Sequence, residues 1–524
     1  MKRRDFLRTT VPAAVLPSVI NGFSLKSFAA DSPLAQLLGG GADNDHVLVI
    51  VQLQGGNDGL NMVIPKDIYS NYYNARSNVA IAENRILGLT GNDKTGLHPS
   101  MTGLQSMYNE GNLGIVQSVG YPQPNFSHFR ATDIWMTGSD SNQVINNGWG
   151  GRYLDYEFPN FPNGYPNSSM PDPLGIQIGS ITSLMFQGPS VSMGMSLSNP
   201  TTFYNLVSGI EDPAPNTPAG KELKYVRQVA KQTSKYADVV KSAALNVTQQ
   251  ATYPANNSLG DQLKIVARLV KGGLKTKIYM VSYGGFDTHS LQTTTTDTAT
   301  GSHAVLLKNV SDALKAFQDD LTYLGVEDRV MGFTFSEFGR RIKSNSSNGT
   351  DHGAAAPLFI FGKHAMQTVH GTSPAIPATA TVNDNIPMQY DFRSVYASML
   401  QDWLCVKSTD LQQVMLQNFQ NLPLVSTSAC KPVIPNPSGV TIIDNYPNPF
   451  TASTLIRFNT AGGHTMIQIM DTTGRVIATP VDKDFAVSGN YNVTFNGSGL
   501  VSGVYYARFQ NGAVQQVRSM MKVR

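Results

Sequence analysis

Residues 46–54, HVLVIVQLQ, are followed directly by GGNDG at residues 55–59, and together they give the first indication of the fold. The apolar residues of 46–54 are mostly β-branched or leucine and run almost without interruption, which predicts a strand buried on both faces. Such strands form the sheets of α/β proteins, in which helices cover both faces. The glycine-rich turn ends the strand and places Asp58 just beyond its carboxyl end.

The pattern of a strand followed by polar side chains occurs twice more. The strand expected at 277–283 is followed by GGFDTH, which contains Asp287 and His289, and the strand expected at 330–335 is followed by SEFGR, which contains Glu337. In open α/β sheets, ligands bind outside the carboxyl ends of the strands. We therefore expect these three side chains to point into one crevice, together with the aspartate of the first turn.

Strands and helices alternate along residues 31–430. The helix expected at 302–324 is amphipathic, because its apolar residues recur every three or four positions. The alternation predicts a doubly wound sheet with helices on both sides, an α/β/α sandwich. The order of strands within 153–274 is not predicted, since the pattern there is less regular. The other expected elements are strands at 113–119 and 358–361 and helices at 99–108 and 392–404.

A fourth polar cluster, GTDHG at residues 349–353, precedes the strand expected at 358–361 and could fold back over the same edge of the sheet. Crowded carboxylates repel one another unless cations lie between them, so the combined set favours one or two divalent metal ions. Imidazole and carboxylate ligands leave zinc, manganese, calcium and iron open. The candidate metal ligands are Asp58, Asp287, His289, Glu337, Asp351 and His352.

Several of these residues also have a purely structural interpretation. Asp58 could form an Asx turn, and Asp351 could cap a turn. Glu337 could form a surface ion pair with Arg340 or Arg341. Their occurrence at successive strand ends favours a shared site over separate structural roles.

A candidate nucleophile follows the strand expected at 113–119. Ser127 begins a helix and is followed by His128 and Arg130, which complete the candidate catalytic set. Backbone N–H groups at a helix N-terminus and the Arg130 guanidinium would stabilise negative charge after attack on a phosphorus or sulfur centre. The alternative, favoured for a serine in this position, is that Ser127 only caps the helix.

Six motifs are spread over residues 45–405: LQGGNDGLN at 53–61, SHF at 127–129, GWGGR at 148–152, FDTH at 286–289, SEFGRR at 336–341 and TDHG at 350–353. In their order and identity they resemble the domain of unknown function 1501 family. That family is similar to the alkaline phosphatase and sulfatase superfamily, and this resemblance implies an α/β/α sandwich and metal-assisted cleavage of phosphate or sulfate esters.

By position, the resemblance implies that Asp58, Asp287, His289 and His352 are metal ligands and that Ser127 is the nucleophile. The chain departs from the superfamily in two ways. The superfamily usually carries an Asp-His pair where this chain has the SE of SEFGR, and it separates the preceding aspartate and histidine further. With fewer histidines, the site is expected to be richer in oxygen ligands, and zinc with phosphatase chemistry is less strongly implied.

Residues 1–30 are predicted to be a signal peptide. Basic residues near the start precede a short apolar stretch at 11–20 and a small-residue cleavage pattern, SFA, at 27–29. The run RRDFL at 3–7 resembles the twin-arginine export signal, which implies passage through the twin-arginine translocase; the alternative is an ordinary secretory signal. The apolar stretch is shorter than the roughly 20 residues that a membrane span needs, so no membrane anchor is expected.

A proline-rich linker at 431–440 leads into residues 441–524, where short alternating strands and turns predict a small β-sandwich. The motifs NYPNPF at 445–450, DTTGR at 471–475 and LVSGVY at 500–505 resemble the C-terminal sorting domain (type A) of the type IX secretion system. The resemblance implies handling by the type IX machinery and delivery to the cell surface or exterior of a Gram-negative Bacteroidetes-type bacterium. The alternative is a carbohydrate-binding or adhesive sandwich.

Composition narrows the classes of partner. The 524 residues carry 39 Lys and Arg against 36 Asp and Glu, an excess too small to indicate a nucleic-acid partner. Charged residues make up 14% of the chain, against about 25% in typical proteins, which favours an exported protein. The two cysteines, Cys405 and Cys430, exclude a disulfide-rich scaffold and a zinc ribbon. They could pair or remain buried thiols.

The sequence therefore predicts an exported, metal-dependent hydrolase of phosphate or sulfate esters, acting on a small-molecule or glycan ester. The alternative is a non-catalytic cell-surface protein that uses the same crevice to hold a glycan or cell-wall component.

Overall fold

The computed structural model divides into two compact units, with the boundary between Lys431 and Pro432. Each unit is described by itself. The expected signal peptide at 1–30 and linker at 431–440 lie outside the described residues, except for a pairing of β1 (Val19–Ile20) with β2 (Phe23–Ser24). The structure describes residues 19–20, 23–24, 44–198, 217, 236–426, 430, 441–460, 462–487, 489–511 and 514–523.

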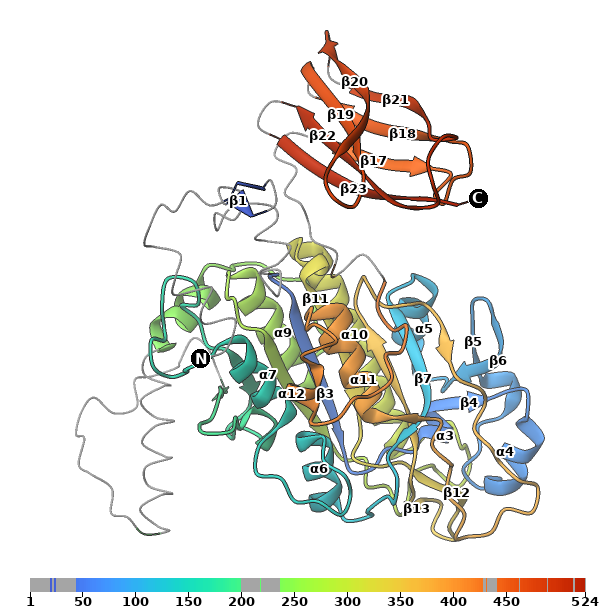
Figure 1. Cartoon of the computed structure of the whole chain (residues 1–524). Helices are drawn as coiled ribbons and strands as arrows, with labels where there is room; N and C mark the ends of the chain where they lie inside the picture. Colours follow the sequence, from blue (N-terminus) through green and yellow to red (C-terminus); the bar gives the residue numbers. More distant parts are fainter. Residues whose placement is uncertain are drawn as a thin grey trace. The chain divides into compact units, whose positions relative to one another are not determined.

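The first unit is built on a nine-stranded sheet, and the strand formed by residues 47–54 lies in its middle (Figure 1). Strand β3 (Val47–Gln54) lies between β10 (Ile278–Gly284) and β11 (Val330–Phe335), and both run parallel to it. Gly284 pairs with Gln54 and Phe335 with Gln52, so all three strands end at the same edge, as the sequence predicted. The other strands are β7 (Leu113–Gly120), β8 (Gly175–Ile178), β9 (Gly194–Leu197), β14 (Ala356–Phe361), β15 (Val369–His370) and β16 (Tyr390–Asp391).

The sheet is mixed rather than wholly parallel. Strand β14 runs antiparallel to both of its neighbours, β11 and β7. A parallel connection needs a crossover of a dozen or more residues, usually a helix. Between β11 and β14 the chain forms only the hairpin of β12 (Arg340–Ser344) and β13 (Thr350–His352), so it returns in the opposite direction.

Helices cover both faces of the sheet. Successive side chains of β3 point to opposite faces, so they contribute to two different cores. Val49 and Val51 belong to a core that includes residues of α5 (Thr102–Asn109), α9 (Ser258–Lys271) and α10 (Ser302–Leu324). Leu48 and Ile50 belong to a second core. That core includes residues of α6 (His128–Thr137), α7 (Trp149–Glu157), α11 (Phe392–Ser398) and α12 (Leu411–Met415). The predicted α/β/α sandwich is confirmed.

The helix expected at 392–404 continues from α11 into a π-helical turn, Met399–Trp403. A small three-stranded sheet is formed by β4 (Val63–Pro65), β6 (Asn92–Leu97) and β5 (Leu87–Leu89). Two short helices, α3 (Gly59–Met62) and α4 (Tyr69–Arg76), precede and follow β4. Within the described ranges, no helix combines the length and apolar character that crossing a bilayer requires.

The second unit is the small β-sandwich that the sequence predicted. One sheet has the order β17-β18-β21 and the other β20-β19-β22-β23, and their apolar side chains form one core. The strands are β17 (Thr441–Tyr446), β18 (Ser453–Thr460), β19 (Gly463–Met470), β20 (Val476–Phe485), β21 (Gly489–Asn496), β22 (Gly503–Asn511) and β23 (Val514–Lys522).

The two cysteines form a disulfide, which settles the alternative that the sequence left open. Cys405 and Cys430 are joined with a Cα–Cα distance of 5.3 Å. The bond follows the π-helical turn and closes a loop of 25 residues in sequence separation. It thereby attaches the last described residue before the linker to the end of a buried helix.

We predict that replacing both cysteines, Cys405→Ser with Cys430→Ser, lowers the free energy of unfolding of the first unit by about 3 kcal/mol, the value expected for a loop of this length. Urea denaturation without reductant measures the change. Reductant should destabilise the unmodified protein by a similar amount and leave the double variant unchanged. Equal stability of the two proteins under oxidising conditions would contradict the prediction.

Candidate metal centre

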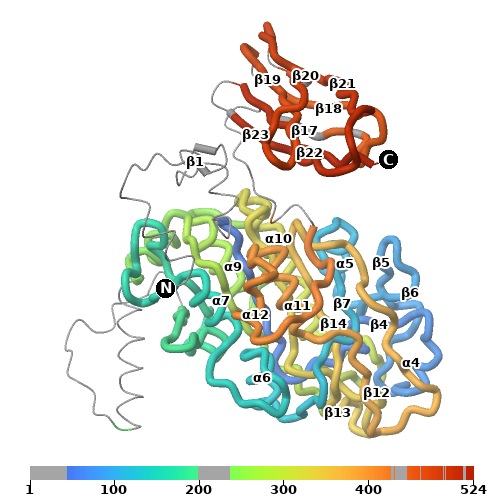
Figure 2. The backbone as a smooth tube through the Cα atoms, viewed as in Figure 1, coloured from blue at the N-terminus to red at the C-terminus, as the bar shows by residue number. Residues whose placement is uncertain are grey.

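Three histidines and one aspartate converge at the carboxyl edge of the sheet. Asp287 and His289 follow β10, His352 ends β13, and His128 begins α6. The Nε2 atoms of His289 and His352 lie 2.9 Å apart, and each is 3.2 Å from Asp287 Oδ1. His128 Nε2 lies 3.5 Å from Asp287 Oδ2. In Figure 2, α6 and β13 lie at the same end of the first unit.

Each of the three histidines has its other ring nitrogen held by an oxygen acceptor. A backbone carbonyl or an ionised carboxylate can only accept a hydrogen bond, so each Nδ1 carries a proton. In the neutral ring, the lone pair is then on Nε2, the atom that faces the shared point. The pairs are His128 with Glu337 Oε1 at 2.7 Å, His289 with Asp351 Oδ1 at 3.0 Å, and His352 with the Phe126 carbonyl at 2.8 Å.

The short contact between the Nε2 atoms of His289 and His352 requires a positive charge at these atoms. With both Nδ1 atoms protonated, the two Nε2 lone pairs at 2.9 Å are compatible only if one ring is an imidazolium or if both nitrogens coordinate the same metal ion. Burial lowers the pKa of His352 below its ordinary value, which disfavours the imidazolium on that ring. The donor set fits a metal ion, because its imidazoles are oriented by oxygen acceptors as ligand histidines usually are.

Asp287 is held in its ionised form by a buried arginine. Arg340 Nη2 donates to Asp287 Oδ1 at 2.7 Å, and the arginine side chain is fully buried. Burial alone would raise the pKa of Asp287, but hydrogen bonding and attraction from Arg340 outweigh it and lower that pKa to about 2. Asp287 thus offers a carboxylate to a cation throughout the physiological pH range.

The same guanidinium fixes the turn that follows β3. It donates to the carbonyls of Gly55 and Gly56, and also to those of Phe286 (3.1 Å) and Thr350 (2.7 Å). Gly55 and Gly56 have φ of +123° and +71°, and a Cβ on Gly55 would lie 2.4 Å from the Asp287 nitrogen. Glycine is therefore required for the turn to approach the loop of Asp287.

The turn also positions Glu337. The Gly55 N–H donates to Glu337 Oε1 at 2.9 Å, the same oxygen that accepts from His128. Glu337 is buried, and it pairs with His128 rather than with Arg340 or Arg341, the ion pair considered from the sequence. Asp351 similarly supports His289 and itself accepts from Asn345 Nδ2 at 3.0 Å.

The structure thus changes the arrangement expected from the sequence. Asp287, His289 and His352 face the shared point as predicted, while Glu337 and Asp351 hold the outer sides of the histidine rings. His128, expected beside the nucleophile, contributes a third imidazole. The convergent donors are therefore richer in nitrogen than the sequence predicted, and imidazole suits zinc, iron, copper and nickel.

Asp58 lies outside this group, contrary to the sequence prediction. It is fully buried, and Arg76 Nη1 donates to both of its oxygens at 2.7 Å. Gln292 Nε2 donates to Oδ2 at 2.6 Å. Burial raises the pKa of Asp58, but the attraction of Arg76 more than compensates and the net shift is downward. Its carboxylate is occupied by this ion pair, which joins the turn after β3 to α4.

Arg130 also differs from the prediction. Its Nη2 donates to the carbonyls of Asp140 (3.4 Å), Ser141 (3.3 Å) and Gln143, so its guanidinium is committed to the loop after α6. The arginine at the convergent donors is instead Arg340, which was expected only as an ion-pair partner of Glu337. Its role depends on four backbone carbonyls from three separate segments, for which the sequence carries no local signal.

Ser127 is exposed at the N-cap position of α6 but does not make the side-chain cap that its position favoured. Its backbone N–H donates to Asn125 Oδ1 at 2.9 Å. The residue lies between Phe126, whose carbonyl holds His352, and His128, which Glu337 holds. Its backbone is therefore fixed on both sides by the histidine supports.

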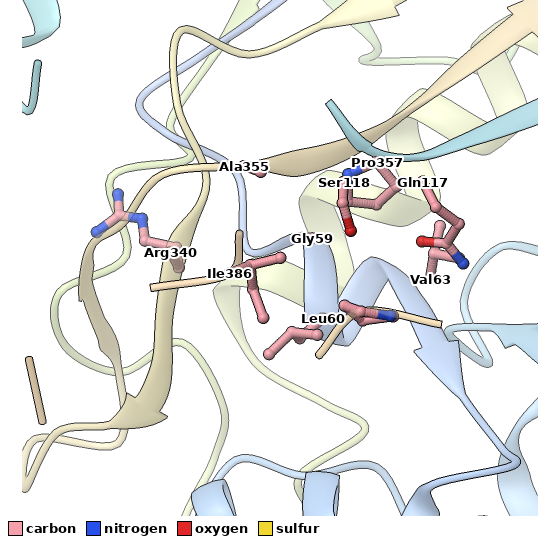
Figure 3. A pocket seen from close by; sticks show the side chains of 10 residues that line it. Gly59, Leu60, Val63, Gln117, Ser118, Arg340, Ala355, Pro357 and Ile386 are labelled. Atoms are coloured by element: carbon pink, nitrogen blue, oxygen red, sulfur yellow. The ribbon is translucent and has the colours of Figure 1, made fainter. Parts of the chain in front are cut away.

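A small cavity lies beside Arg340 and is lined at one end by Gln117 (Figure 3). Its volume is about 10 Å³, room for about one water molecule. Gln117 Nε2 is buried without a hydrogen-bond partner among the described residues, which suits such a water. The other lining residues are Gly59, Leu60, Val63, Ser118, Ala355, Pro357, Pro374 and Ile386. The cavity is too small for a substrate.

Comparison with known families supports both resemblances noted in the sequence. Residues 212–402 match the family described as protein of unknown function DUF1501, and residues 444–523 match the secretion system C-terminal sorting domain. No curated protein matches the chain. Both matches agree with the resemblances that the sequence motifs indicated.

Solved structures similar to this chain include a sulfatase from Pseudoalteromonas sp., with 11% identity, coverage of 85% of this chain and 84% of that chain, and a TM-score of 0.32. They also include a protein of the alkaline phosphatase superfamily from Vibrio parahaemolyticus, with 9% identity, coverage of 92% and 84%, and a TM-score of 0.29. Alkaline phosphatase from the Antarctic bacterium TAB5 shares 9% identity, with coverage of 62% and 94% and a TM-score of 0.24.

We predict that Arg76→Met lowers the free energy of unfolding by about 3–5 kcal/mol, because it leaves Asp58 as a buried charge without its partner. Chemical denaturation measures the loss. The matched control is Arg85→Met, which breaks the exposed ion pair with Asp297 and should cost only about 0–1 kcal/mol. Similar losses in the two variants would show that the buried ion pair contributes no more to the free energy of unfolding than the exposed one.

Proposed function

We propose that this chain, with its DUF1501 match and its C-terminal sorting domain, is an exported, metal-dependent hydrolase of phosphate or sulfate esters. The observation that carries the proposal is the convergence of three imidazole Nε2 atoms on one carboxylate, with every Nδ1 held by an oxygen. Such an arrangement is typical of metal sites. The proposed ligands are His128, Asp287, His289 and His352.

Ser127 is the proposed nucleophile. A bound divalent ion would polarise the ester oxygen and lower the pKa of the attacking hydroxyl. The Ser127 hydroxyl, free of a capping bond, would give its proton to solvent water as Oγ bonds to phosphorus or sulfur, and the ester bond to the alcohol would break as the leaving oxygen takes a proton from solvent. Water would then cleave the seryl ester and release the inorganic anion.

The residues behind the histidines would keep the site rigid during this reaction. Glu337 and Asp351 hold two rings, and His128 is itself the first residue of α6. A helix N-terminus stabilises anions such as a phosphate or sulfate group. Arg130 has no part in the proposal, because loop carbonyls occupy it.

The location of the enzyme follows from its two end segments. We propose that the tail directs the chain through the type IX machinery to the cell surface or exterior, and that residues 1–30 provide a twin-arginine signal for the first membrane. Folding before export suits a protein whose ligands come from distant parts of the chain, because the twin-arginine route carries folded proteins.

Metal analysis and ester assays test the proposal together. The purified protein should contain about one divalent ion and hydrolyse an aryl phosphate or an aryl sulfate. Ser127→Ala should retain the metal and lose at least about 10³-fold in kcat, by analogy with other serine nucleophiles. His464→Ala, an exposed histidine of the tail, is the control and should change neither property. A folded protein that holds a metal and turns over neither ester would favour the non-catalytic binding protein.

The supporting carboxylates provide an independent test. We predict that Asp351→Ala weakens metal affinity by about 10–100-fold, because His289 loses the acceptor that orients its ring. Competition with a chelator, read by metal analysis, measures the affinity without an activity assay. Asp384→Ala, which removes a partly exposed aspartate that accepts from the Thr381 N–H, should leave the affinity unchanged. Unchanged affinity in Asp351→Ala would remove Asp351 from the site.

A further inference from the structure

Phe129 is the most exposed large apolar side chain that the structure describes, with 87% of its surface accessible. Full burial of a phenylalanine stabilises a protein by about 1.5–3 kcal/mol, and none of this is gained at such exposure. The residue immediately follows His128, one of the convergent donors. An aromatic ring in water beside a polar centre needs an explanation beyond folding.

The packing of α6 supplies no structural role for this ring. The buried residues of the helix are Ala131, Ile134, Trp135, Met136 and Thr137. Residues 131, 134 and 135 form the usual stripe at three- and four-residue spacing, and position 129 falls outside it. The next residue back, His128, packs against the Phe338 ring with a centroid distance of 4.9 Å. Phe129 is therefore fixed in place by a well-held neighbour while its own ring stays free.

A second exposed apolar side chain follows another of the convergent donors. Leu291, two residues after His289, is 70% exposed and has a φ of +52°, a conformation that costs a leucine about 1–2 kcal/mol. Both of its backbone groups are held: its N–H donates to the Ser347 carbonyl at 3.1 Å, and its carbonyl accepts from Ser302 Oγ at 2.8 Å. The loop thus maintains a strained, outward leucine.

The convergent donors themselves are open to solvent. The side chains of Asp287 and His289 are 46% and 45% exposed. Small-molecule sites usually bury most of their ligand in a concave pocket. Because this centre is open, the charged ester group can reach the metal ligands directly. The organic part of the substrate must then be bound by side chains that surround the centre.

We propose that Phe129, assisted by Leu291, binds the ring of a cyclic alcohol whose phosphate or sulfate ester reaches the convergent donors, so that the substrate class is sugar esters. The inference rests on the proposed function. A sugar ring presents a face of C–H groups that stacks on an aromatic ring, while its hydroxyls stay in water, which suits an exposed platform. An acyclic ester has no such face and gains little from Phe129.

Binding of a cyclic and an acyclic phosphate ester to the zinc-loaded Ser127→Ala protein tests, without turnover, whether Phe129 and Leu291 form a platform for the ring. Glucose 6-phosphate and glycerol 3-phosphate are both phosphate esters of a primary alcohol, and only the first has a ring. Calorimetry should show tighter binding of the sugar ester. Adding Phe129→Ala should weaken glucose 6-phosphate binding by about 10-fold, the size of one stacking contact, and change glycerol 3-phosphate by less than about 2-fold. Phe129→Trp should retain the preference.

Val144→Ala is the matched control, because Val144 is also apolar and 80% exposed but does not adjoin a convergent donor. It should change the affinity for neither ester. Equal binding of the two esters, undetectable binding of glucose 6-phosphate at millimolar concentration, or an unchanged preference in Phe129→Ala would overturn the platform. Turnover of the aryl phosphate and the aryl sulfate by the unmodified protein is measured separately. A protein that prefers the ring ester but hydrolyses neither aryl ester would overturn the proposed hydrolase and leave the proposed role of Phe129 in ring binding intact.

Discussion

The buried guanidinium of Arg340 is the interaction on which the rest of the centre depends. It binds the carboxylate of Asp287 and backbone carbonyls that belong to separate turns, after β3, after β10 and within β13. A buried cation is stable only when its donors are satisfied, so the turns must approach one another closely. Gly55 and Gly56 make this approach sterically feasible. One side chain therefore fixes the spacing of three strand ends.

Much of the first unit could be predicted, because its central strands are strongly apolar and end in glycine-rich polar turns. Strands β3, β10 and β11 and helix α10 lie where the sequence placed them. The antiparallel β14 could not be predicted, since its direction follows from the hairpin before it rather than from its own residues. In the second unit, β20 and β23 lack the regular alternation that predicts a strand. Both are edge strands, which commonly carry proline and charged or polar residues instead of regular alternation.

The sequence predicted better which residues come together at the centre than what each of them does there. Strand-end placement correctly brought Asp287, His289 and His352 together. Strand-end placement failed for Asp58, because its carboxylate forms an ion pair with Arg76. Arg76 lies on a short helix in a polar stretch, and nothing in that stretch predicts the pair. Strand-end placement also could not separate a residue facing the shared point from one behind a ring, as with Glu337, because both positions favour a carboxylate.

The disulfide has a mechanical consequence. A chain pulled by its C-terminal end normally frays from that end inward, residue by residue. Here the segment before the linker is held by a bridge between Ala365 and Val425 and by a hydrogen bond from the Ser426 N–H to the His364 carbonyl. Cys430, which lies between these weak contacts and the linker, is covalently joined to Cys405. Tension on the tail therefore passes first to Cys405 at the end of the buried helix, and the segment from 405 to 430 is not itself stretched.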